Sequence, residues 1–243
     1  MSDLTQGIWS NWSGFQKAKP QQILQPVNIQ ELQSIVYEQQ KIRVVGAGHS
    51  FTPLVCTDAT LVSLDRISGV ASFDVEHCQS NIYAGTRLYD LDQHLQQQSI
   101  NQALMNQGDI DQQSLAGAVS TGTHGTGADL HCISAYVEAF ELLTASGEIL
   151  KCSRTENSEI FAAGRVSLGS LGILTKITMQ NRPRYKLKEH IQLCLVEDMM
   201  QNIQQWKHQH RHIECFIFCY EKQLMLKTLD ETDEEILPRK ENF

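Results

Sequence analysis

Apolar positions recur along the chain with two periods, one typical of amphipathic helices and the other of strands. The helical period predicts four helices, within residues 28–39, 87–98, 156–165 and 196–210. Asn28 and Glu31 have the spacing of a capping box at the start of the first of them. Short apolar runs bounded by turn residues predict strands at residues 41–45, 60–64, 70–75, 81–85, 171–180, 185–195, 213–220 and 223–229.

The order of these elements predicts the fold class and a division of the chain. Residues 134–153 are predicted to form a hairpin with Ser146 and Gly147 at its turn. Helices and strands are mixed throughout without an internal repeat, which predicts an α+β or α/β chain. A change of composition at Arg182 and Pro183 predicts a domain boundary near residue 183.

The composition excludes some classes of function. The chain has 243 residues, of which 41% are hydrophobic, and 28 acidic against 20 basic side chains give a formal charge of −8. That balance argues against nucleic-acid binding, because such proteins need clustered Lys and Arg. No apolar run reaches the roughly 18 residues expected of a membrane span. Residues 1–20 lack the positive and apolar regions of a secretory signal, so we expect a cytoplasmic protein.

Cysteine and histidine patterns give little support to a metal site. The seven cysteines are scattered without a CxxC pair, which favours reduced, mostly buried thiols. His208, His210 and His212 alternate at the end of a predicted helix, where alternate residues do not share a face. We therefore expect polar surface there, and no bound metal.

Two glycine-rich stretches resemble phosphate-binding loops but lack the residues of the best-known types. "VVGAGHSF", residues 44–51, follows a predicted strand, yet Phe51 stands where a dinucleotide-binding Rossmann turn needs its third glycine. In "GAVSTGTH", residues 117–124, Thr123 and His124 replace the Lys and Ser/Thr of a phosphate loop. A nicotinamide-dependent dehydrogenase and a nucleotide triphosphatase are both disfavoured.

Together, the two stretches favour a bound dinucleotide. Glycine lets the backbone approach a diphosphate closely, so that backbone N–H groups bind it without a lysine. Hydroxyl groups accompany both stretches, at Ser50, Ser114, Ser120, Thr121 and Thr123. For either stretch alone, an ordinary tight turn is the better explanation.

Three ordered segments carry a more specific resemblance. They are "VVGAGHSFTPLVCTD", "NQGDIDQQSLAGAVSTGTHGTG" and "RVSLGSLGILTKITM", and "NWSG" at residues 11–14 precedes them. They resemble the aldonolactone oxidases, which include L-gulono-1,4-lactone and D-arabinono-1,4-lactone oxidases of the vanillyl-alcohol-oxidase flavoprotein superfamily. The resemblance implies a two-subdomain FAD-binding fold of the PCMH type at residues 1–183. Residues 184–243 would form the incomplete beginning of an α+β substrate, or cap, domain.

The same resemblance assigns residues to the cofactor. His49 matches the histidine that is bonded covalently to the 8α-methyl group of FAD, and a neutral imidazole is a competent nucleophile near neutral pH. A His49 that only packs or forms hydrogen bonds remains the alternative. The residues implied to contact the diphosphate and ribose are Val44, Val45, Gly46, Ala47, Gly48 and Ser50. Those implied to line the opposite side or the flavin are Asp109, Ser114, Gly117, Thr121, Gly122, Thr123, His124 and Ile173, and for His124 a structural role is an equal alternative.

The implied reaction is hydride transfer from a sugar-lactone carbon to the flavin, followed by electron transfer to O2 that yields hydrogen peroxide. Gly108 matches a position where glycine leaves oxygen access to the flavin and alanine gives a dehydrogenase. The family's general base and substrate-binding residues match no part of this sequence, and Cys219, Tyr220 and Glu221 depart from the family pattern.

Alternatives remain open at this stage: a flavin-binding module with little or no turnover, or an alditol oxidase or dehydrogenase. The sequence selects neither the lactone or polyol nor the oligomeric state. Some relatives associate peripherally with membranes, and the sequence contains no basic amphipathic helix of the kind that binds membrane surfaces.

Overall fold

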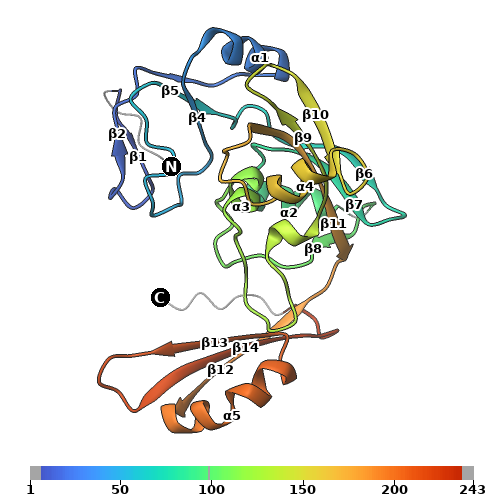
Figure 1. Cartoon of the computed structure of the whole chain (residues 1–243). Coiled ribbons are helices and arrows are strands. Elements are labelled where there is room, and N and C mark those ends of the chain that lie inside the picture. The colour runs from blue at the N-terminus through green and yellow to red at the C-terminus, as the bar shows by residue number, and fades with distance from the viewer. Residues whose placement is uncertain (1–6, 98, 237–243) are drawn as a thin grey trace. The chain divides into compact units, whose positions relative to one another are not determined.

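The computed structural model describes residues 7–97 and 99–236, and its contacts divide into two compact units (Figure 1). The first unit comprises residues 1–124 and 132–183, and the second comprises residues 125–131 and 184–243. Both units mix helices and strands, which confirms the α+β prediction. Three parts of the chain lie outside the described residues: residues 1–6, which belong to the segment compared with a secretory signal, residue 98 at the end of a predicted helix, and residues 237–243.

A small parallel sheet in the first unit carries the first glycine-rich stretch. Strands β3 (Gln22–Leu24), β5 (Thr60–Ser63) and β4 (Ile42–Val45) are ordered β3-β5-β4. Helix α1 (Ile29–Glu38) begins at Asn28, whose side chain accepts a hydrogen bond from the Glu31 N–H at 2.8 Å. The Glu31 carboxylate accepts from the Val27 N–H at 2.9 Å, one residue before the position that a capping box uses. The predicted helix start is confirmed, with this change in the reciprocal bond.

A larger antiparallel sheet forms the rest of the first unit. Its strands are β10 (Ile149–Ser153), β9 (Val137–Leu143), β11 (Ile173–Pro183), β7 (Gln79–Tyr83) and β6 (Val70–Asp74), in that order, and β8 (Gln102–Leu104) also pairs with β11. The accompanying helices are α2 (Leu88–Leu95), α3 (Leu115–Ser120), α4 (Ser158–Gly164) and a 3-10 turn at Ile133–Tyr136. One buried apolar cluster includes side chains from α1, both sheets, α2 and α3, so the two sheets share a core.

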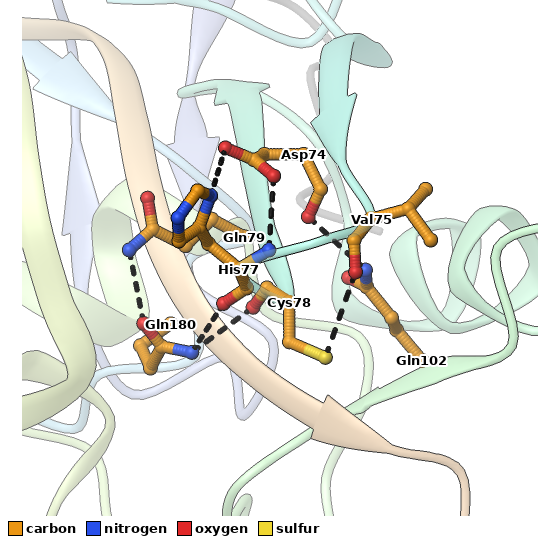
Figure 2. A network of polar contacts seen from close by, with 7 residues as sticks. All are labelled: Asp74, Val75, His77, Cys78, Gln79, Gln102 and Gln180. Carbon is orange, nitrogen blue, oxygen red and sulfur yellow. Dashed lines mark hydrogen bonds and ion pairs between the residues drawn. The ribbon is translucent and has the colours of Figure 1, made fainter.

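Polar side chains fix the turn between β6 and β7 (Figure 2). The Asp74 carboxylate accepts hydrogen bonds from the His77 N–H at 3.0 Å and the His77 ring at 2.9 Å. Gln180 of β11 donates to the carbonyl oxygens of His77 and Cys78 and accepts from Gln79. These bonds connect the edge strand β6 to the centre of the sheet through side chains as well as through the strand ladder.

The prediction omitted several short elements. The first unit opens with a hairpin of two-residue strands, β1 (Trp9–Ser10) and β2 (Lys17–Ala18). Strands β3 and β8 have three residues each and α3 has six, too few to produce a hydrophobic period. The predicted hairpin at 134–153 is confirmed as β9 and β10, and Gly147 in its turn has φ of 79°.

The second unit is a three-stranded antiparallel sheet with one helix. Strands β12 (Leu187–Leu195), β14 (Gln223–Glu231) and β13 (His212–Ile217) are ordered β12-β14-β13, and α5 (Val196–Gln209) packs on one face through Met199. The prediction of polar surface at the three alternate histidines is wrong for His212, which is buried and whose ring Nδ1 donates to the Thr126 carbonyl oxygen at 3.1 Å. Its position at the start of β13, where a side chain points to one face of the sheet, explains the burial.

The described residues contain no helix with the length and hydropathy needed to cross a membrane. In the same part of the chain, His, Cys, Asp and Glu form no group that could hold a metal ion. All seven cysteines are free thiols. The expectation that most are buried is wrong: Cys152 is buried, Cys219 is exposed and the others are half-buried.

Candidate functional site

A cavity of about 700 Å³ lies within the first unit, and both glycine-rich stretches contribute to its wall. Its volume falls in the range of roughly 300–1,000 Å³ that is usual for small-molecule sites. The predicted site residues that line it are Val44, Val45, Gly46, Ala47, Gly48, His49, Ser50, Ser114, Gly117, Thr121 and Ile173. The structure therefore brings together residues separated by more than 120 positions in the sequence.

The two stretches touch at Gly46 and Ser114. A methyl group at Gly46 would overlap Ser114 Oγ and lie 3.1 Å from Ser114 Cβ. Ser114 is the N-cap of α3, and its Oγ accepts a hydrogen bond from the Gly117 N–H at 3.3 Å. Alanine at position 46 would therefore fit only if the Ser114 hydroxyl rotates away and the neighbouring backbone moves by a few tenths of an ångström.

The loop after β4 directs its hydrogen-bonding groups in a specific way. The carbonyl oxygens of Gly48, His49, Ser50 and Phe51 each accept a hydrogen bond from the segment between β1 and β2. The N–H groups of residues 47–50 donate to none of the residues that the structure describes. Gly48 has φ of 69°, a left-handed conformation that occurs in anion-binding backbone nests. Residues 47–50 thus line the cavity, and their backbone donors form no hydrogen bond with the residues that the structure describes.

In the second stretch and the start of α3 before it, the backbone N–H groups do have partners within the protein. At the start of α3, the N–H groups of Leu115 and Ala116 donate to the carbonyl oxygens of Thr86 and Ala84, and the Gly117 N–H donates to Ser114. Farther on, the N–H groups of residues 121–123 bond to carbonyl oxygens of α3. The expectation that both stretches offer backbone N–H groups is therefore wrong for the second, because its own folding uses them.

His49 lies on the cavity wall and is half-buried. Its ring stacks on Trp12, with centroids 5.3 Å apart and planes 11° apart. Burial is the main cause that lowers the pKa of His49 below its usual value of 6.5, and the positive charge of Arg87 also contributes. The ring nitrogens bond to no other described residue, so the neutral imidazole keeps an available lone pair.

The remaining predicted residues lie outside the cavity wall: Gly108, Asp109, Gly122, Thr123 and His124. A methyl group at Gly108 would lie 3.2 Å from the His124 carbonyl oxygen, so these two segments are adjacent. The Thr123 hydroxyl accepts a hydrogen bond at 3.2 Å from Gln113, which does line the cavity. Their roles toward a cofactor stay predictions.

Sequence reasoning missed part of the wall. Residues 168–172 line it, and Leu168, Gly169 and Gly172 all have positive φ. The signal was present, because this segment belongs to "RVSLGSLGILTKITM", of which only Ile173 was assigned a contact. Gly85 also lines the cavity and was not predicted. A methyl group at this position would overlap the Leu64 carbonyl oxygen.

These features fit the dinucleotide that the resemblance implies. Unused N–H groups at residues 47–50 suit a diphosphate, since charge-assisted bonds of this kind are about twice as strong as neutral ones. Trp9 and Gln113 line the cavity, and each carries a buried polar atom, Nε1 and Oε1, that has no partner among the described residues.

Comparison with protein families finds two matches. The model described as "FAD binding domain" matches residues 20–153, and the model described as "D-arabinono-1,4-lactone oxidase" matches residues 177–242. The first match covers more than half of the chain and includes the loop after β4 and helix α3.

Individual relatives agree with these matches. The chain is 34% identical over 235 residues to L-gulono-1,4-lactone dehydrogenase of Mycobacterium tuberculosis, covering 95% of this chain and 54% of the relative. It is 31% identical to L-gulonolactone oxidase of Bos taurus, over 80% of this chain and 45% of the relative. It is 32% identical to D-arabinono-1,4-lactone oxidase of Candida albicans, over 80% of this chain and 38% of the relative. The chain thus spans about half the length, or less, of these curated relatives.

The fold also matches a solved structure. A histidine-to-alanine mutant of cholesterol oxidase from Brevibacterium sterolicum superposes with a TM-score of 0.79 at 16% identity. The match covers 94% of this chain and 48% of that one. At this identity the likeness shows the fold, which confirms the predicted FAD-binding architecture.

Proposed function

Because this chain belongs to the FAD-binding family that includes the aldonolactone oxidases, we propose that it is the flavin-binding part of an enzyme that oxidises a sugar-derived aldono-1,4-lactone. The observation that carries the proposal is the cavity bounded by the loop after β4, helix α3 and residues 168–174. Residues 1–183 would be the FAD-binding domain, and residues 184–243 the beginning of the substrate domain.

In this proposal each part of the wall has a task. The N–H groups of residues 47–50 hold the diphosphate, and Ser114, Gly117, Thr121 and Ile173 bound the other side of the cofactor. FAD held there would supply the redox chemistry, which is hydride acceptance from the lactone carbon and electron transfer to O2 with release of hydrogen peroxide. We assign no general base to this chain. Its 243 residues would contribute cofactor binding and orientation.

His49 is the proposed point of covalent attachment. A His49 ring nitrogen would bond to the 8α carbon of FAD; the ring N–H hydrogen and one 8α hydrogen would pass with two electrons to the flavin ring, and O2 would take them up as hydrogen peroxide. The lowered pKa of His49 supports this role, because the reaction requires the neutral ring. The unbonded ring nitrogens support it too.

Gly108 is the proposed position of oxygen access. A methyl group there would be 3.2 Å from the His124 carbonyl oxygen, so alanine fits only if the neighbouring segment moves by a few tenths of an ångström. Gly108→Ala should reduce peroxide formation more than transfer of electrons to an artificial acceptor. An equal loss with both acceptors would contradict an oxygen-specific role.

Two measurements test the central proposal. The purified chain is precipitated with acid, and flavin absorbance is measured in the pellet and the supernatant. We expect flavin in the pellet for the wild type and in the supernatant for His49→Ala, because only the covalent bond survives denaturation. Failure of the folded chain to bind added FAD would refute the function.

Turnover is measured separately, with L-gulono-1,4-lactone and D-arabinono-1,4-lactone as substrates. Peroxide release indicates an oxidase, whereas reduction of an artificial acceptor alone indicates a dehydrogenase, the activity in the name of the Mycobacterium tuberculosis relative. Bound flavin with neither reaction would leave a flavin-binding module without turnover.

A further inference from the structure

The segment between β1 and β2, residues 11–16, holds the loop after β4 by an unusually regular set of bonds. Trp12 donates from its backbone N–H to the Gly48 carbonyl oxygen at 3.1 Å and from its indole to that of His49 at 3.0 Å. The side-chain amides of Asn11 and Gln16 donate to the next two carbonyl oxygens, those of Ser50 and Phe51, at 3.0 and 2.9 Å. Four consecutive carbonyl groups are thus bound by one short segment.

The segment is itself rigid through Asn11. This side chain is buried, and its Oδ1 accepts hydrogen bonds from the Gln16 N–H at 3.0 Å and the Ser13 hydroxyl at 3.2 Å. The Gly14 N–H donates to the Asn11 carbonyl oxygen, which closes the turn. The donors that bind the loop are therefore held in place before any ligand enters.

Trp12 is placed to orient the His49 ring. Its indole stacks on the imidazole and donates to the backbone carbonyl of the same residue, so both ends of His49 are held. Stacking restrains the ring without occupying either ring nitrogen, whereas a hydrogen bond would use one. The Trp12 side chain is 48% exposed, so its contribution to the core of the first unit is small.

We propose that Asn11, Trp12 and Gln16, the donors in the segment of residues 11–16, act as a positioning clamp for the cofactor loop: they hold its carbonyl groups away from the ligand, and Trp12 orients His49 for bonding to the flavin. The clamp lies outside residues 20–153, the part matched by the FAD-binding model. Trp12 is a positioning residue, because it acts through His49. The proposal rests on the proposed function, since the orientation matters only if FAD is attached at His49.

The test compares Trp12→Leu with Trp12→Phe in the full chain. Both lose the indole hydrogen bond, but only phenylalanine keeps an aromatic face for the imidazole. Flavin-free protein is mixed with FAD, and acid-stable flavin is measured over time. We expect Trp12→Leu to slow attachment roughly tenfold or more, because misplacing a reacting group by about 1 Å costs up to about a hundredfold. Trp12→Phe should recover most of the rate.

Phe15→Leu provides the matched control: it changes an aromatic residue of the same segment that is 86% exposed. It should attach flavin at the wild-type rate, and all three variants should unfold at nearly the wild-type temperature. Equal attachment rates for Trp12→Leu and the wild type would overturn the proposal. A slow rate accompanied by a large loss of thermal stability, or equally slow rates for Trp12→Leu and Trp12→Phe, would also overturn it.

The two proposals fail in different ways. If wild-type protein binds FAD but holds none after acid treatment, covalent attachment fails, and the clamp is tested through FAD affinity. Gln16→Ala and Asn11→Asp each remove one bond to the loop, and Asn11→Asp keeps the Oδ1 that accepts from the Gln16 N–H. We then expect each to weaken FAD binding severalfold. Unchanged affinity in both would overturn the clamp.

Discussion

Substitution of Gly46 by alanine is the most direct test of the contact between the loop after β4 and helix α3. The added methyl group would overlap Ser114 Oγ and lie 3.1 Å from Ser114 Cβ. Rotation of the serine hydroxyl removes the overlap but breaks its hydrogen bond to the Gly117 N–H. Loss of an N-cap costs about 0.5–2 kcal/mol.

The second contact remains after that rotation. A separation of 3.1 Å between two carbon atoms is shorter than van der Waals contact, so backbone must move on one side. Overpacking of this kind costs about 1–3 kcal/mol. We expect Gly46→Ala to lower the free energy of unfolding by about 2–4 kcal/mol in total. For a unit of this size, each kcal/mol lowers the melting temperature by about 2–4 °C.

The second mutation that isolates the contact is Ser114→Gly. Glycine costs only a few tenths of a kcal/mol at an N-cap and removes both atoms that the new methyl group would meet. The double variant with Gly46→Ala should therefore recover to within about 1 kcal/mol of the wild type. Ser120→Ala is the control background, because no atom of Ser120 is among those that a methyl group at Gly46 would meet. In that background, Gly46→Ala should lower the free energy of unfolding by the full amount.

Urea denaturation followed by circular dichroism measures all of these variants. Strict additivity of Gly46→Ala and Ser114→Gly would show that the two stretches do not meet as described. A Gly46→Ala variant as stable as the wild type would lead to the same conclusion. Either result would remove the structural basis for a shared cofactor site.

Three further predictions concern packing and charge in the first unit. Gly85→Ala should destabilise by about 3 kcal/mol or more, because its methyl group would overlap the Leu64 carbonyl oxygen; a normal yield and urea midpoint would disprove it. Burial raises the pKa of Asp92, so the charged carboxylate destabilises the folded state above that pKa. Asp92→Asn should therefore raise the melting temperature at pH 7 but not at pH 3. A lower melting temperature of Asp92→Asn at pH 7 would contradict this. The pKa of His49 is lowered, so its contribution to stability is present above pH 6.5 and is lost as the pH falls through the folded-state pKa. As the pH is lowered, the free energy of unfolding of His49→Gln, measured by urea titration at each pH, should therefore fall less than that of the wild type. Parallel curves of unfolding free energy against pH would be inconsistent with the shift.

Long, regular elements could be predicted from the sequence because their stability has a local signature. In α2, the stripe of Leu88, Leu91 and Leu95 predicts both the helix and its buried face, and all three side chains are fully buried. Helix α3 has no such signature. Its first N–H groups bond to the carbonyl oxygens of Ala84 and Thr86, about 30 residues earlier in the chain, so tertiary contacts stabilise it.

The site was predictable to a similar degree. Glycine and hydroxyl content indicated which stretches meet at the cavity, and Gly46 and Gly117 do line it. The composition could not indicate which of the two stretches keeps free backbone donors. That property depends on hydrogen-bond partners elsewhere in the chain, such as Asn11 and Gln16, whose pairing with the loop leaves no periodic pattern.

The comparison between the two stretches explains why glycine alone is a weak indicator of phosphate binding. Glycine permits the backbone to approach a ligand closely. Each peptide group carries both a donor and an acceptor, so glycine does not decide which of the two is available to a ligand in the cavity. After β4, external donors bind four carbonyl groups and leave the N–H groups of residues 47–50 available to an anion. At α3, carbonyl groups bind the N–H groups instead, and the same kind of sequence provides only a close-packed wall. We therefore expect a glycine loop to bind an anion where a separate segment binds its carbonyl groups, and in this chain residues 11–16 provide those donors for the loop after β4.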